Sequence, residues 1–113
     1  MTKGEILNQI GLLKQYLLDA LMSFPECVTR DQLQKAAMAI EIHMHEANCH
    51  TDAKESIRSL INTHGWLEDT KSLAYIAVSY GYLKEGQCAA VQQQCDVLIA
   101  ALMSQIDDTC TPL

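Results

Sequence analysis

Apolar residues near the start of the chain recur at alternating intervals of four and three residues. The positions with this spacing are Ile6, Ile10, Leu13, Leu17, Ala20 and Phe24. An α-helix places such residues on one side, and the four-three alternation is typical of the seam that one helix presents to another. The spacing therefore predicts a helix that packs lengthwise against other helices. No stretch of the chain alternates between apolar and polar residues as a half-buried strand would.

Capping signals predict where the first helices begin. Thr2 and Thr29 are each followed three residues later by a glutamate or a glutamine, which is the spacing of a capping box. A second four-three series follows the second cap: Leu33, Ala37, Ile40, Met44 and Ala47. Pro25 separates the two segments, because the residue before a proline is forced out of the helical region. The first half of the chain thus predicts an antiparallel helical hairpin.

The second half predicts further helices with less regular boundaries. Asp52 is a predicted cap for a third, shorter helix, and Gly65 is predicted to end it in a left-handed conformation. A fourth helix is predicted from residue 70 to about residue 86, with apolar residues on nearly all sides. Its predicted inner face is Leu73, Ile76, Ala77, Tyr80 and Leu83. A fifth helix is predicted to bury Val91, Cys95, Leu98, Leu102 and Ile106.

These elements predict an all-α fold, a compact antiparallel bundle of four to five helices. A chain of 113 residues has the size of one domain. We expect a single helical-bundle domain over residues 1–106 and a flexible C-terminal tail over residues 107–113.

Composition disfavours several classes of partner. The chain has 14 acidic and 8 basic residues, for a formal net charge of −6, and the basic residues are scattered. Phosphate contacts dominate nucleic-acid affinity, so we expect no nucleic-acid partner, and the absence of a basic run disfavours an anionic membrane. No N-terminal stretch resembles a secretory signal, and the five cysteines show no C-x-x-C spacing. The expected location is cytoplasmic.

The stretch HMHEANCH, residues 43–50, concentrates potential metal ligands. On a helix, His43, Glu46 and His50 share one edge beside the buried seam, whereas His45 and Cys49 point away. Imidazole and carboxylate groups on one helical edge can bind zinc or another transition metal. The alternative is structural, since histidines near a helix C-terminus interact favourably with its unpaired carbonyls. We expect the protein to have no cofactor. Metal binding by His43, Glu46 and His50 is the alternative function that the sequence allows.

Catalytic motifs are missing from the sequence. It contains no glycine-rich phosphate loop, no G-x-S-x-G and no H-E-x-x-H. Cys49 lies beside histidines at a predicted helix end, where such a pairing is more often incidental than nucleophilic. If His64 or a histidine of the 43–50 stretch were phosphorylated, the protein would resemble phosphotransfer bundles only in its size and number of helices. We expect the protein not to be an enzyme.

The segment over residues 73–99 resembles one tetratricopeptide unit. Leu73, Ala77, Tyr80 and Ala89 have the spacing of that repeat on two consecutive helices. The resemblance covers about a quarter of the chain and occurs once. It implies a helical hairpin at this place.

Surplus apolar surface favours a function in protein binding. Tyr75, Val78 and Tyr82 lie outside the predicted seam, and Leu7 and Leu18 form a second stripe on the first helix. Together they offer more apolar surface than one core of this size needs to bury, and exposed apolar and aromatic side chains are typical of interfaces. We expect a small protein that acts through protein–protein interaction, as a regulator, adaptor, inhibitor or chaperone. Homodimerisation would bury this surface economically, because a two-fold interface uses the same patch on both copies. The alternative is that the other helices enclose the fourth helix, so that these residues are buried within one chain.

Overall fold

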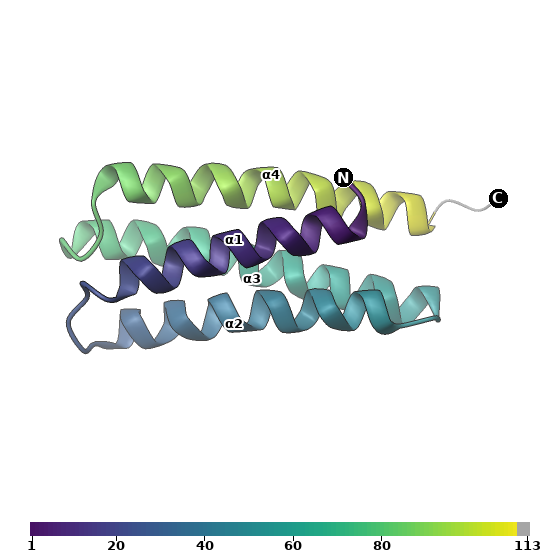
Figure 1. Ribbon diagram of the computed structural model, residues 1–113, viewed down its shortest axis with the longest axis horizontal. Coiled ribbons are helices and arrows are strands. Elements are labelled where there is room, and N and C mark those ends of the chain that lie inside the picture. Colours follow the sequence, from purple (N-terminus) through teal and green to yellow (C-terminus); the bar gives the residue numbers. More distant parts are fainter. Residues whose placement is uncertain (111–113) are drawn as a thin grey trace.

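The computed structural model describes residues 1–110, which form an up-down-up-down bundle of four helices (Figure 1). The helices are α1 (Lys3–Leu21), α2 (Val28–Cys49), α3 (Ala53–Ser79) and α4 (Glu85–Cys110). Each helix packs against the next in sequence, and α4 closes the ring against α1. The bundle measures 50 × 21 × 19 Å. The predicted all-α antiparallel bundle is confirmed, and its four helices fall within the predicted four to five.

The predicted seams of the first, second and last helices form the core. Their fully or almost fully buried positions are Ile6, Ile10, Leu13, Leu17 and Ala20 in α1, Leu33, Ala37, Ile40, Met44 and Ala47 in α2, and Val91, Cys95, Leu98 and Leu102 in α4. These residues belong to one hydrophobic cluster that includes all four helices. Burial of each large aliphatic side chain contributes about 1.5–3 kcal/mol, so the seams supply the main stabilising free energy of the bundle.

The third and fourth predicted helices are one continuous helix, α3, and the prediction that Gly65 ends a helix is wrong. Gly65 lies in the middle of α3, and among the described residues Gly81 alone has a positive φ, of 77°. A glycine lowers helix propensity by about 1 kcal/mol. Packing of a long amphipathic helix outweighs that loss. The chain therefore reverses at Gly81, between α3 and α4.

This continuity changes the side of α3 that faces the core. Its buried seam keeps the four-three spacing over its whole length: Ser56, Leu60, Thr63, Leu67, Thr70, Ala74 and Ala77. Ile76 and Tyr80, predicted to lie inside, are 42% and 65% exposed. The prediction of an inner face through these two residues is wrong because it treated the segment as a separate helix with its own apolar face.

Three hydroxyl side chains in the α3 seam are satisfied locally. Thr63 and Thr70 each donate a hydrogen bond to the carbonyl four residues earlier, at 2.8 Å. Ser56 donates to the carbonyl of Ala47 at 3.0 Å and so ties the start of α3 to the end of α2. Because each hydroxyl has an acceptor, these small polar residues can occupy core positions without a large desolvation penalty.

Two of the predicted caps are present. The Thr2 hydroxyl accepts from the Glu5 amide at 3.1 Å, and the Thr2 amide donates to the Glu5 carboxylate at 3.0 Å, which completes the capping box. The Asp52 carboxylate accepts from the Lys54 amide at 3.0 Å and caps α3. These local bonds satisfy amides that no helical carbonyl can reach.

The predicted cap at Thr29 is wrong. The extended residue before α2 is Cys27, which makes no side-chain capping bond, and Thr29 lies within the first turn. The Cys27 carbonyl already accepts from the Asp31 amide at 3.2 Å, so α2 starts earlier than the capping-box spacing predicted.

The end of α4 overlaps the predicted tail. Residues 107–110 continue the helix, and the Thr109 hydroxyl donates to the Gln105 carbonyl at 2.8 Å. The rest of the predicted tail, residues 111–113, lies outside the described residues.

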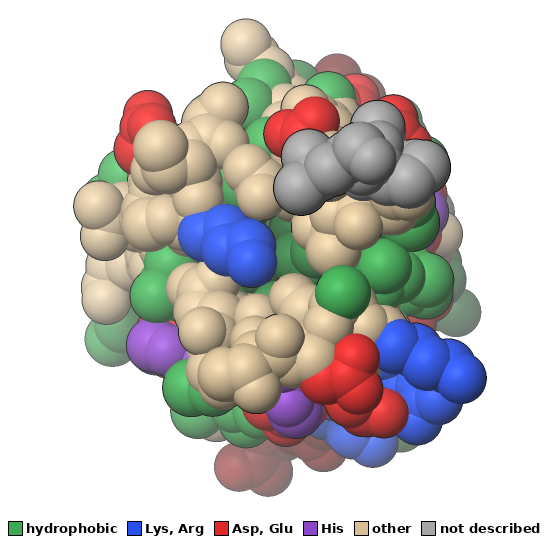
Figure 2. Space-filling model, turned by 90° about the vertical axis from the view of Figure 1, so that its right-hand side faces the viewer, with side chains coloured by type: hydrophobic (Ala, Val, Ile, Leu, Met, Phe, Trp, Pro, Cys, Tyr) green, Lys and Arg blue, Asp and Glu red, His purple; other side chains and the backbone are tan. Residues whose placement is uncertain are grey.

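The two ends of the bundle have different surfaces. The α1–α2 and α3–α4 connections lie at one end (Figure 1). In or near these connections are the four most exposed large hydrophobic side chains of the described residues, Met22 (82%), Val28 (70%), Tyr80 (65%) and Tyr75 (62%). Figure 2 shows the opposite end, where acidic, basic and other polar side chains cover much of the surface. The most exposed of the large hydrophobic side chains thus lie at or near the end with the two connections, while others, such as Leu12 and Ile61, lie elsewhere on the bundle.

Replacement of a seam residue tests the core. We expect Leu67→Ala to lower the free energy of unfolding by about 2–5 kcal/mol, because Leu67 is fully buried and the change leaves a cavity. The matched control Leu12→Ala, at a position that is 60% exposed, should change it by less than about 0.5 kcal/mol. Urea denaturation followed by circular dichroism measures both, and equal losses would contradict this core.

A pair of glycine variants tests the continuity of α3. An added Cβ meets no atom within 4 Å at either Gly65 or Gly81, so the two sites differ in backbone conformation and not in space. We expect Gly65→Ala to stabilise the protein by up to about 1 kcal/mol, as in any exposed helix interior. Gly81→Ala should destabilise it by roughly 1–2 kcal/mol because of the positive φ. Destabilisation by Gly65→Ala in the same denaturation assay would indicate a break in the helix.

Candidate functional site

The structure brings together two of the three predicted metal ligands. His43 Nδ1 and Glu46 Oε2 lie 3.6 Å apart on α2. His50 follows the last residue of α2 in an extended conformation, as its C-cap, and is exposed. Within residues 1–110, no group of three or more His, Cys, Asp or Glu side chains is placed to hold a metal ion. Metal binding by His43, Glu46 and His50 thus remains a prediction from the sequence.

Leu7 and Leu18, two of the predicted partner-binding residues, support the core from one side of α1. Both are half-buried and pack against the hydrophobic cluster. Lys14, which helical spacing places on the same side, pairs with Glu41 of α2 at 2.8 Å. This stripe therefore lies at the α1–α2 contact, on the side of the bundle opposite the groove that α3 forms with α4.

Tyr82, another predicted partner-binding residue, joins the two connections at the apolar end. Its ring lies 5.7 Å from that of Phe24 and stacks on that of Tyr80 at 5.7 Å, with 23° between the planes. Tyr82 is half-buried, whereas Tyr80 covers it from the solvent side. Tyr82 thus contributes mainly to packing.

A groove between the C-terminal part of α3 and the N-terminal part of α4 contains the remaining predicted partner-binding residues, Tyr75 and Val78. We call it the α3–α4 groove. It is lined by Tyr75, Val78, Ser79, Glu85, Cys88, Ala89 and Gln92, and its volume is about 560 Å³. Glu85 is the one lining residue with a charged side chain at neutral pH. The groove is therefore an apolar depression beside an exposed tyrosine.

One buried polar atom lies in the lining of the α3–α4 groove. Gln92 Nε2 donates to the carbonyl of Lys71 at 2.9 Å and contacts Cys88 Sγ at 3.7 Å. Gln92 Oε1 is buried and accepts no hydrogen bond from residues 1–110. Because it is buried, this oxygen is not open to a group that enters the groove, and it belongs to the packing of the lining.

The charge beside the groove is neutralised. Lys71 Nζ on α3 and the Asp96 carboxylate on α4 lie 2.6 Å apart, and this hydrogen bond raises the pKa of Lys71. Asp96 is the only charged residue in segment 86–106. Apart from Glu85 in the lining, the surface of α4 next to the groove is consequently almost free of net charge.

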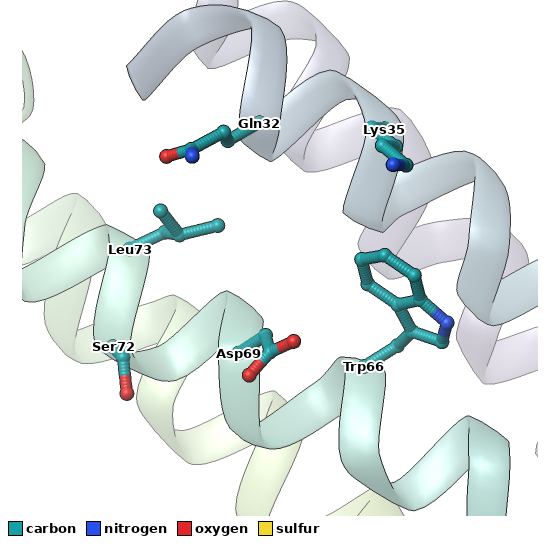
Figure 3. A pocket seen from close by; sticks show the side chains of 6 residues that line it. All are labelled: Gln32, Lys35, Trp66, Asp69, Ser72 and Leu73. Atoms are coloured by element: carbon teal, nitrogen blue, oxygen red, sulfur yellow. The ribbon is translucent and has the colours of Figure 1, made fainter. Parts of the chain in front are cut away.

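A second depression lies between α2 and α3 and has a polar lining. Figure 3 shows Trp66, Asp69 and Leu73 on α3 facing Gln32 and Lys35 on α2. The volume is about 310 Å³, and Lys35 Nζ lies 5.8 Å from the centre of the Trp66 ring, a cation–π contact. Charged groups of both signs line this depression, which makes it less suited than the α3–α4 groove to an apolar partner.

Sequence reasoning missed both depressions as sites. It selected Tyr75 and Val78 because they lie off the predicted seam, but the facing residues Cys88, Ala89 and Gln92 belong to another helix. No pattern within a single helix shows which residues of two helices meet. A signal was present in the scarcity of charge over residues 86–106.

Comparison with known proteins gives a similarity of fold. No protein-family model and no curated protein matches the sequence. A solved structure of a protein of unknown function from the S23 ribosomal protein family of Bacteroides thetaiotaomicron is similar, with a TM-score of 0.89. The match covers 95% of this chain and 99% of that chain at 13% identity. The chain thus has the four-helix fold of that structure, and an identity this low supports the fold alone.

None of the described helices is long and apolar enough to cross a membrane.

The cysteines differ in accessibility, and one has a strongly shifted pKa. All five are free, Cys49 and Cys110 are exposed, and Cys88 and Cys95 are buried. Burial raises the pKa of the Cys95 thiol from its ordinary value of 9.0 to about 12. We expect thiol reagents at mildly alkaline pH to modify Cys49 and Cys110 rapidly and Cys95 only on unfolding, which mass spectrometry of labelled peptides measures.

The same shift predicts how stability changes at alkaline pH. Above about pH 9 the unfolded chain ionises Cys95 while the folded protein keeps it protonated, so ionisation favours the unfolded state. We expect the Cys95 contribution to stability to fall as the pH rises from about 9 to about 12. Cys95→Val should show a smaller fall in urea denaturation over this range than the unmodified protein, and equal falls would contradict the burial of the thiol.

Proposed function

We propose that this protein works by binding another protein chain through the α3–α4 groove and Tyr75. The observation that supports it best is the groove itself, an apolar depression of about 560 Å³ bordered by a tyrosine that is 62% exposed. Tyrosine is enriched at protein interfaces because its ring offers a large apolar surface while its hydroxyl can remain hydrogen-bonded.

The surroundings of the groove favour a macromolecular partner. Further exposed apolar side chains, Met22, Val28 and Tyr80, lie in or next to the connections at the same end of the bundle. Several exposed large apolar side chains near one groove are typical of interfaces between proteins. Regulators, adaptors, inhibitors and chaperones act through such surfaces, and we place this protein among them.

A photo-crosslinker in the groove tests this function. We expect p-benzoylphenylalanine in place of Tyr75 to give a discrete covalent adduct with a protein on irradiation in the native cell, because the side chain would lie against the partner. The same group in place of Gln34, which is exposed on α2 away from the groove, should give no such adduct. Gel electrophoresis and mass spectrometry detect the adducts. No adduct at position 75, or the same adducts at both positions, would contradict the proposal.

A further inference from the structure

Ion pairs between neighbouring helices show an exception at the α2–α3 contact. At two other contacts a lysine of one helix meets an acidic residue of the next: Lys14–Glu41 at 2.8 Å and Lys71–Asp96 at 2.6 Å. Lys35 of α2 and Asp69 of α3 line one depression, yet neither forms an ion pair with any side chain of residues 1–110. This depression therefore holds one positive and one negative group without an ionic partner.

We infer that the α2–α3 depression binds a free α-amino acid with an apolar side chain. The carboxylate of the amino acid pairs with Lys35, and its ammonium group pairs with Asp69. Its side chain lies against Trp66 and Leu73. The depression shares no lining residue with the α3–α4 groove, so the inference goes beyond the proposed function and does not depend on it.

The lining of the depression suits a small molecule with an apolar part. Trp66 and Leu73 are half-buried and pack against the hydrophobic cluster, so the core fixes their positions. Lys35 and Asp69 are exposed at the edge. Ligand sites combine apolar walls with a few polar groups and have volumes of roughly 300–1,000 Å³. At about 310 Å³, this depression admits only a small occupant.

The ammonium group of Lys35 is held beside this apolar surface. Its Nζ lies 5.8 Å from the centre of the Trp66 ring, and Figure 3 shows Lys35 on the α2 wall with Asp69 on the facing α3 wall. The cation–π contact keeps the charge near the ring but supplies no anionic acceptor for the N–H groups. A carboxylate bound over Trp66 would supply that acceptor in a charge-assisted hydrogen bond.

The two charges together select a zwitterion. A ligand with only an ammonium group would pair with Asp69 but would be repelled by Lys35. A ligand with only a carboxylate would pair with Lys35 but would meet Asp69 and a chain of formal net charge −6. An α-amino acid carries both groups on one carbon, so each charge meets its opposite and neither meets its like.

The fluorescence of Trp66 tests the inference in the full chain, because Trp66 is its only tryptophan. We expect phenylalanine or leucine to change this fluorescence to saturation, with a dissociation constant that isothermal titration calorimetry reproduces. Phenethylamine lacks the carboxylate and hydrocinnamate lacks the ammonium group. Each should bind roughly threefold to tenfold more weakly than phenylalanine, because one ionic contact is lost.

Charge-deleting variants separate the two contacts. Lys35→Gln should weaken phenylalanine binding roughly threefold to tenfold without weakening phenethylamine, which has no carboxylate. Asp69→Asn should weaken phenylalanine by a similar factor without weakening hydrocinnamate. Both positions are exposed, so circular dichroism should show unchanged helicity. The matched control is Glu68→Gln, which removes an exposed carboxylate outside the lining and should leave the dissociation constants unchanged.

Three results would overturn the inference. The first is the failure of both phenylalanine and leucine to bind. The second is binding of phenethylamine or hydrocinnamate as tight as that of phenylalanine, since the depression would then recognise a single charge. The third is an equal loss of phenylalanine binding in Glu68→Gln and Asp69→Asn. Crosslinking at position 75 concerns the other groove, so the proposed function stands or fails separately.

Discussion

The packing of α3 against both α2 and α4 is the interaction on which the rest of the structure depends. This helix has 27 residues and supplies a seam of seven core positions with a regular four-three spacing. The seam remains unbroken because Thr63 and Thr70 satisfy their hydroxyls within the helix itself. Small and hydroxylated residues at core positions let the neighbouring helices approach closely. The register of α3 thus sets which faces of α2 and α4 it packs against, and α1 completes the core through its contacts with those two helices.

The register of α3 also creates the candidate interaction surface. With Ala74 and Ala77 in the core, helical geometry places Tyr75 outside and Val78 at the edge beside α4. A helix that ended at Gly65 and restarted with a different face inward would bury Tyr80 and Ile76 instead. The exposed tyrosine at the groove is thus a consequence of core packing along the whole helix.

The similarity to the solved S23-family structure shows how little sequence identity this architecture requires. At 13% identity the two chains share a fold with a TM-score of 0.89 over nearly their full lengths. A four-helix bundle requires apolar residues at its seam positions and short connections between its helices. Many different apolar side chains of suitable size can fill those seam positions. Surface features such as Tyr75, Gln92 and the uncharged face of α4 are not required by the fold, and function has to be sought there.

The sequence by itself determined the elements that depend on local bonds and on periodicity. The capping box at Thr2, the cap at Asp52 and the four-three seams in α1, α2 and α4 follow from residues a few positions apart, so they were predictable. Tertiary structure decided the rest. Whether Gly65 interrupts a helix depends on packing free energy along 27 residues, and threonines at seam positions conceal that continuity from any count of apolar residues. The same holds for the surface. Leu7 lies far from Tyr75, and Tyr75 and Gln92 line one groove, because of which helices are neighbours in the bundle. The pattern of residues within one helix does not show which helix lies beside it.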